Sequence, residues 1–186
     1  MQGPRPFLIG GLWRHGETVV PVNNPFTGQR LAEVSNASST DAETAIQSTV
    51  DAAAVMGALP SHARYQVLQK IAGGLYDRRE EFARLMTAEA GKPIADAKRE
   101  VSRAVQTFTI AAEEAKRIPG EVIPLDWTPG TDSHLGILRR VPIGPVLGIT
   151  PFNFPLNLVA HKVAPALAAG NCVITEPPPQ APLTAL

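Results

Sequence analysis

Residues 144–171 constrain the fold more than any other part of the chain. They begin with a short continuous apolar run, Val146-Leu-Gly-Ile149, which is typical of a strand covered on both faces. A helical pattern follows over residues 155–169 and ends at Gly170, and Cys172-Val-Ile-Thr175 predicts a second buried strand. A strand, a helix and a strand in such close succession predict a βαβ unit, and therefore the beginning of a parallel sheet.

The N-terminal part of the chain combines short strands with amphipathic helices. Turn residues at 24–28 punctuate a strand pattern over residues 7–34. The sequence Thr40-Asp-Ala-Glu43 predicts a capping box at the start of a first helix, and Ser61 is expected to cap a second. A long helix is expected between Pro93 and Pro119, where apolar residues keep the helical period. We expect these helices to form a layer over a sheet.

The composition excludes several classes of function. Hydrophobic residues make up 44% of the chain and charged residues 18%, which is the balance of a globular protein. The formal net charge is zero, so a nucleic-acid partner is not expected. A single Cys excludes an internal disulfide and fits a reducing compartment, and four scattered His offer no metal-ligand spacing. With no signal peptide and no apolar run of membrane-spanning length, we expect a cytoplasmic protein without membrane association.

Asn153 is the strongest candidate for a catalytic residue. It follows the first buried strand and precedes the helix, where ligands collect in α/β folds. A carboxamide held there can donate to the oxygen of a carbonyl under attack. The alternative is an Asn that caps the helix, which is a common role at this position.

Two further residues have both a functional and a structural interpretation. Cys172 lies within a buried-strand pattern, where a thiol behaves as a small hydrophobe, so we do not expect a nucleophile there. Arg103 lies on the long helix beside its apolar stripe. Its guanidinium could pair with a carboxylate or phosphate, or form a surface ion pair with Glu100 or Asp96.

Several separated motifs resemble the aldehyde dehydrogenase superfamily. They are Asn24-Pro-Phe-Thr-Gly28, Gly91-Lys-Pro93, Pro151-Phe-Asn-Phe-Pro155 and Ala164-Pro-Ala-Leu-Ala-Ala-Gly-Asn171. In that family a cysteine thiolate attacks the aldehyde, hydride passes to NAD or NADP, and water releases the acid. The resemblance implies that Asn153 is the oxyanion-stabilising residue, and it favours this role over helix capping.

The resemblance also implies the domain organisation. We expect an α/β fold with an incomplete Rossmann-like parallel sheet, an N-terminal helical layer and a β arm. Residues 1–120 are expected to supply the strands and helical layer of the cofactor-binding domain. Residues 121–143 are expected to form the oligomerisation arm of a homo-oligomer, and residues 144–186 the first βαβ unit of the Rossmann-like domain. The catalytic domain of the family is expected to be absent from this chain.

The cofactor cleft implied by the resemblance contains one departure from the family. The residues expected to line it are Ile149, Thr150, Pro151, Phe152, Glu176 and Pro179. The family usually has Lys where this chain has Glu176, and that Lys bonds the adenosine ribose. Glu176 either accepts hydrogen bonds from the ribose hydroxyls and repels a 2′-phosphate, or marks a cofactor site that has decayed.

The resemblance finally bears on substrate and activity. In relatives that act on small anionic aldehydes, an Arg at the place of Arg103 reaches the anionic group of the substrate. The family's catalytic Cys and general-base Glu are expected beyond Leu186, so the 186 residues alone are expected to be inactive. The alternatives are a truncated, non-catalytic binding or interaction module and an inactive remnant.

Overall fold

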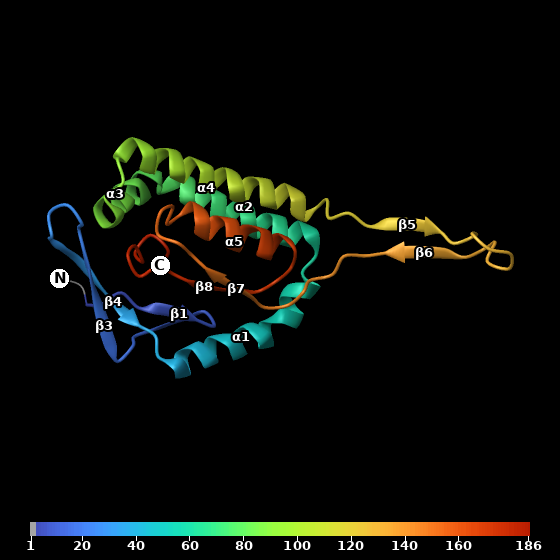
Figure 1. The fold of residues 1–186 in the computed structure, drawn as a ribbon, viewed down its shortest axis with the longest axis horizontal. Coiled ribbons are helices and arrows are strands. Elements are labelled where there is room, and N and C mark those ends of the chain that lie inside the picture. The colour runs from blue at the N-terminus through green and yellow to red at the C-terminus, as the bar shows by residue number, and fades with distance from the viewer. Residues whose placement is uncertain (1–2) are drawn as a thin grey trace.

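The computed structural model describes residues 3–186, whose strands pair into four separate two-stranded sheets (Figure 1). Three of the sheets are antiparallel hairpins, and the sheet of β7 and β8 is parallel. The strands are β1 (Phe7–Ile9), β2 (Leu12–Arg14), β3 (Thr18–Asn23), β4 (Arg30–Asn36), β5 (Glu121–Pro124), β6 (Leu135–Leu138), β7 (Val146–Ile149) and β8 (Val173–Glu176). The helices are α1 (Ser39–Ala58), α2 (Ser61–Asp77), α3 (Arg79–Ala90), α4 (Ile94–Ala115) and α5 (Asn157–Ala168).

The start of α1 differs from the sequence-based expectation. The capping box is formed by Ser38 and Asp41, not by Thr40 and Glu43. The Ser38 hydroxyl accepts from the Asp41 amide at 3.1 Å, and the Asp41 carboxylate accepts from the Ser38 amide at 2.9 Å. Both pairs have the spacing of a capping box, but the earlier pair lies directly where the chain leaves β4. The expectation for Ser61 is also wrong, because Pro60 occupies the cap and Ser61 is the first helical residue.

The hydrophobic core lies among α2, α3, α4 and α5. Helix α4 has 22 residues and contributes a stripe that runs from Ala97 to Ala115, as its period predicts. Much of the core is alanine, which lets the helices approach closely. The buried core residues include Leu68, Ala72, Ala83, Met86, Ala97, Val101, Ala104, Phe108, Ala112, Leu156, Ala160 and Ala164. Of the helices in residues 3–186, none combines the length and the apolar character needed to span a membrane.

The hairpin of β5 and β6 projects away from the helical body (Figure 1). It leaves apolar side chains exposed, among them Trp127 and Ile137. The strand expected over residues 135–141 ends at Leu138, because Leu138 pairs with Glu121 and β5 begins there. Beyond this pair the returning strand has no hydrogen-bonding partner in the sheet.

The βαβ unit is formed by β7, α5 and β8, as the sequence predicts. The second strand begins one residue later than expected, and it is partly exposed and not buried. Helix α5 packs between α4 and this parallel sheet. The expectation that β7 is covered on both faces is wrong in this chain. Gly148 is buried and faces the aliphatic stem of Lys162, whereas Leu147 and Ile149 are 60% and 61% exposed. Because side chains alternate along a strand, α5 covers only one face of β7.

Candidate functional site

The carboxyl ends of β7 and β8 bring several predicted cofactor residues together. Ile149 pairs with Glu176 in the parallel register. The amide and the hydroxyl of Thr150 both donate to the carbonyl oxygen of Glu176, at 3.2 Å and 2.6 Å. Thr150 is buried, and these two hydrogen bonds join the ends of the two strands. Glu176 is exposed at the edge of the sheet.

The loop that follows β7 exposes the remaining candidates. Pro151, Phe152 and Asn153 are exposed one after another, and Pro179 is exposed after β8. Asn153 lies four residues before the first residue of α5. The interpretation of Asn153 as the cap of this helix is therefore wrong, since Leu156 occupies the cap position.

The first amides of α5 are bound by Glu100, a residue that the sequence analysis did not single out. The amides of Leu156 and Asn157 both donate to Oε1 of Glu100 at 3.0 Å. Glu100 is only 2% exposed and comes from α4, more than 50 residues earlier in the chain. Negative charge at a helix N-terminus satisfies orphan amides and complements the helix dipole. A signal existed in the sequence: Glu100 stands between Ala97 and Val101 in the apolar stripe of α4.

Lys92 connects Glu100 to the loop. Its ammonium forms an ion pair with Oε2 of Glu100 and donates to the backbone carbonyl of Asn153 at 3.1 Å. The same ammonium lies 3.9 Å from the centre of the Phe154 ring, in cation–π range. Lys92 follows Gly91, whose φ of 67° ends α3.

Arg103 reaches the same loop from α4. Its guanidinium carbon lies 5.7 Å from the centre of the Phe154 ring, and the residue is exposed. The alternative ion pair with Glu100 or Asp96 is not formed, because Glu100 pairs with Lys92 and Asp96 with Arg99. Arg103 therefore lies beside Phe154, the residue that follows Asn153.

A second buried carboxylate binds the last turn of the chain. Glu89, from α3, accepts from the amides of Leu183 and Thr184 at 2.8 Å and from the Thr184 hydroxyl. Burial raises the pKa of Glu89 above its usual value of 4.5, and these three hydrogen bonds oppose that shift. The sequence analysis did not find this acid, although its position three residues after Met86 places it on the buried face of α3.

Cys172 lies directly before β8 and is partly exposed. Its backbone carbonyl accepts from the amide of Val146 at 2.9 Å, so the residue helps to align the two parallel strands. Within residues 3–186, no group of three or more His, Cys, Asp or Glu gathers as metal ligands would.

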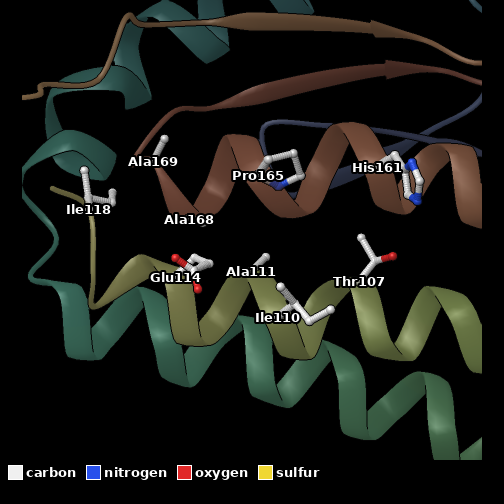
Figure 2. A pocket seen from close by; sticks show the side chains of 9 residues that line it. All are labelled: Thr107, Ile110, Ala111, Glu114, Ile118, His161, Pro165, Ala168 and Ala169. Atoms are coloured by element: carbon white, nitrogen blue, oxygen red, sulfur yellow. The ribbon is translucent and has the colours of Figure 1, made fainter.

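An open groove of about 470 Å³ runs between α4 and α5 (Figure 2). It begins one helical turn beyond Arg103 on α4 and one turn beyond Asn157 on α5. Thr107 and His161 face each other across it, and its lining is mostly apolar (Figure 2). The lining residues are Thr107, Ile110, Ala111, Glu114, Ile118, His161, Pro165, Ala168 and Ala169. The sequence analysis did not anticipate this groove, because its two walls come from helices that are separate in the chain.

Comparison with known proteins places the chain in a family. The profile of the aldehyde dehydrogenase family matches residues 13–186. The chain belongs to the aldehyde dehydrogenase family. The 3-sulfolactaldehyde dehydrogenase of Priestia aryabhattai is 43% identical over 178 residues, which are 96% of this chain and 37% of that relative. This chain thus spans a little over a third of the length of such an aldehyde dehydrogenase.

Solved aldehyde dehydrogenases share the fold. Aldehyde dehydrogenase 21 from Physcomitrella patens, in complex with the reaction product succinate, matches with a TM-score of 0.95 and 41% identity, over 100% of this chain and 39% of that chain. The NADP-dependent glyceraldehyde-3-phosphate dehydrogenase from Bacillus halodurans, complexed with NADP, matches with a TM-score of 0.93 and 34% identity, over 98% and 39%. The predicted family and the predicted Rossmann-like α/β fold are confirmed.

Proposed function

We propose that this chain supplies the oxyanion-stabilising loop and part of the cofactor cleft of an NAD(P)-dependent aldehyde dehydrogenase. The observation that carries the proposal is the loop after β7. Its backbone is held by Lys92 and Glu100, while the side chain of Asn153 is left exposed at the carboxyl end of a parallel strand. Membership of the aldehyde dehydrogenase family supports the same reaction.

Asn153 acts as a hydrogen-bond donor to the substrate oxygen. When a thiolate adds to an aldehyde, negative charge develops on the former carbonyl oxygen, and a fixed amide NH₂ stabilises this charge. One such donor contributes about 3 kcal/mol to the transition state. Because the helix amides are already bound by Glu100, Asn153 is not needed for capping and is available for this role.

The cofactor lies along the carboxyl edge of β7 and β8. Ile149, Pro151 and Phe152 offer exposed surface there, and the exposed carboxylate of Glu176 can accept hydrogen bonds from ribose hydroxyls. The nicotinamide, when bound, accepts the hydride. A carboxylate at this position repels a 2′-phosphate, so we propose that NAD is preferred over NADP.

The Glu176 proposal has a direct test. Replacing Glu176 by Gln in the complete protein should weaken NAD binding and strengthen NADP binding, because the charge that repels the 2′-phosphate is removed. Isothermal titration with each dinucleotide measures both changes. The control is Glu33→Gln, which removes a carboxylate from β4. Unchanged affinity for both dinucleotides would mean that Glu176 does not contact the cofactor, as expected of a decayed site.

We further propose that the substrate is a small aldehyde with an anionic group. Arg103 is exposed beside Phe154, and a guanidinium pairs well with a carboxylate, sulfonate or phosphate. The names of the three similar proteins include a sulfolactaldehyde, succinate and a phosphorylated glyceraldehyde, which all carry such a group. Replacing Arg103 by Ala should raise the KM for anionic aldehydes far more than the KM for neutral ones. Equal effects on both would contradict this role.

The nucleophile is not among residues 1–186 in this proposal. The chain has one Cys, and Cys172 sits between α5 and β8 with its carbonyl engaged by Val146. An active thiolate needs exposed, electropositive surroundings, whereas Cys172 is only partly exposed. The 186 residues alone should therefore not oxidise aldehydes. If they bind NAD without turnover, the alternative of a non-catalytic binding module is favoured over an inactive remnant.

The hairpin of β5 and β6 is proposed to be the oligomerisation arm, within a segment of residues 121–143. Its exposed apolar side chains, such as Trp127 and Ile137, are costly in water and favour burial against a second copy. Residues 1–120 and 144–186 then belong to the cofactor-binding domain. The lone Cys supports a role in the reducing cytoplasm.

The central experiment replaces Asn153 by Ala in the complete protein. We expect kcat to fall by about 10²–10³-fold, with little change in KM or thermal stability, since only the transition state loses a donor. Steady-state kinetics with NAD and an anionic aldehyde measure this. A kcat within about twofold of the parent value would overturn the assignment of Asn153, because a lost oxyanion donor lowers kcat far more than that.

A further inference from the structure

The segment that joins α3 to α4, together with the first two turns of α4, holds residues 153–157 of the Asn153 loop. Lys92 binds the carbonyl of Asn153 and lies over the ring of Phe154. Pro155 is fully buried, and Glu100 binds the amides of Leu156 and Asn157. Each residue from 153 to 157 is thus fixed by burial or by one of two side chains that are themselves paired with each other.

We propose that Lys92 and Glu100 are positioning residues for Asn153, an inference that rests on the proposed function. Glu100 is fixed because it is buried in the core-facing stripe of α4. Lys92 is restrained because Pro93 follows it, which limits the backbone of the preceding residue, and because its nearly buried side chain is paired with Glu100. The loop therefore takes its position from the helical core.

The ion pair explains how a lysine can serve this purpose. The side chain of Lys92 is only 14% exposed, and an unpaired ammonium at that depth is costly. Pairing with Glu100 removes that cost and leaves further donors of the ammonium for the Asn153 carbonyl. A neutral side chain of similar size would fill the space but would not orient the Asn153 peptide.

The contact with Asn153 is not required for helix capping. Oε1 of Glu100 alone accepts from both amides at the start of α5, while Lys92 contacts Oε2 and the carbonyl three residues upstream of Leu156. Lys92 therefore extends the restraint from the helix to the residue whose side chain faces the substrate. A displacement of a catalytic donor by about 1 Å can cost about a hundredfold in rate.

A double-mutant cycle in the complete protein tests the proposal. Lys92→Met should lower kcat about tenfold or more in the parent, because Asn153 loses its orientation. In the Asn153→Ala background the same change should lower kcat less than about twofold, since two residues that act as one unit are non-additive. Equal losses in the two backgrounds would overturn the proposal, as would an unchanged kcat in the parent.

Two further variants keep the test decisive if Lys92→Met fails to fold. Combining Lys92→Met with Glu100→Gln leaves no unpaired buried charge and keeps an acceptor for both amides, yet it still lacks the contact with Asn153. This double variant should also lose kcat about tenfold or more, whereas Lys92→Arg should recover part of it. The control is Lys98→Met, which breaks only an exposed ion pair with Glu80 at 3.0 Å and should leave kcat unchanged.

A readout besides activity separates this inference from the proposed function. In hydrogen–deuterium exchange, Lys92→Met should raise uptake in a peptide covering residues 150–158 and leave the β8 peptide unchanged. If the complete protein oxidises no aldehyde but this local increase is seen, the proposed function fails and the positioning role stands. If uptake in residues 150–158 does not change, the positioning role is wrong whatever the activity.

Discussion

Two turns of this molecule are held by a buried glutamate from a neighbouring helix, and they differ in one respect. Glu100 binds the start of α5 and is paired with a cation, Lys92. Glu89 binds the amides of Leu183 and Thr184 and is supported only by the Thr184 hydroxyl and those amides. Both acids are 2% exposed. Glu100 beside Asn153 is therefore balanced by a cation, whereas Glu89, at the turn that follows β8, is not.

The difference shows what the lysine adds. Hydrogen bonds from two amides and a hydroxyl do not fully offset the desolvation of Glu89, because its pKa remains above the usual value. Around Glu100 an ammonium supplies the compensating charge and also binds the carbonyl of Asn153. A cap that only stabilises a turn can do without a cation, whereas the cap next to Asn153 also orients the loop.

The largest expected effect comes from removing the balanced acid. Glu100→Ala leaves Lys92 unpaired and two buried amides unsatisfied, and should lower the free energy of unfolding by about 3–5 kcal/mol. Urea unfolding followed by circular dichroism measures this change. The control Glu80→Ala removes an acid from an exposed ion pair with Lys98 and should leave the midpoint nearly unchanged. Similar midpoint shifts in both variants would contradict a tertiary cap at Glu100.

Removing the unbalanced acid should cost less. Glu89→Ala leaves the amides of Leu183 and Thr184 without their acceptor, but no buried cation is left behind. We expect a loss of about 2–3 kcal/mol in the free energy of unfolding. The same urea titration measures this loss. A larger loss in the free energy of unfolding than that of Glu100→Ala would contradict the proposed difference between the two caps.

A local cap should cost less than either tertiary cap. At the start of α1, Ser38 and Asp41 form a capping box that is exposed to solvent. Ser38→Ala should lower the free energy of unfolding by about 1 kcal/mol. Thermal unfolding of Ser38→Ala and of Thr40→Ala compares the observed cap with the one that the sequence suggested. The Thr40 variant should show the smaller shift in Tm.

The smallest expected effect is the pH dependence at Glu89. Because its pKa is raised in the folded state, its contribution to stability is fully present below its unfolded pKa and is lost as the pH rises through the folded pKa. The free energy of unfolding of the parent, relative to Glu89→Gln, should therefore fall as the pH increases from about 4.5 toward neutrality. A difference that grows with pH would show that the hydrogen bonds outweigh burial.

The sequence predicted those features whose signals are local. Val146-Leu-Gly-Ile149, the helical pattern before Gly170 and Cys172-Val-Ile-Thr175 each carry their own signal, and together they predicted the βαβ unit. The exposure of Leu147 and Ile149 was not predicted, because an apolar run shows what a strand can bury and not what covers it.

The support of the candidate site could not be found from local patterns. Glu100 is 56 residues from Leu156, and Glu89 is 95 residues from Thr184. A capping box can be seen in four consecutive residues, whereas a cap from another helix has no fixed spacing. The remaining signal is an acid inside an apolar stripe, as at Glu100 between Ala97 and Val101. Such an acid should be considered as a buried hydrogen-bond acceptor before it is treated as a surface charge.

The comparison of the two acids is tested most directly by kcat for aldehyde oxidation in Glu100→Gln and Glu89→Gln variants of the complete protein. Both changes keep an acceptor oxygen and remove a charge. If the Lys92–Glu100 pair positions Asn153, Glu100→Gln lowers kcat about tenfold or more, while Glu89→Gln stays within about twofold of the parent. Equal kcat values in the two variants would contradict the account.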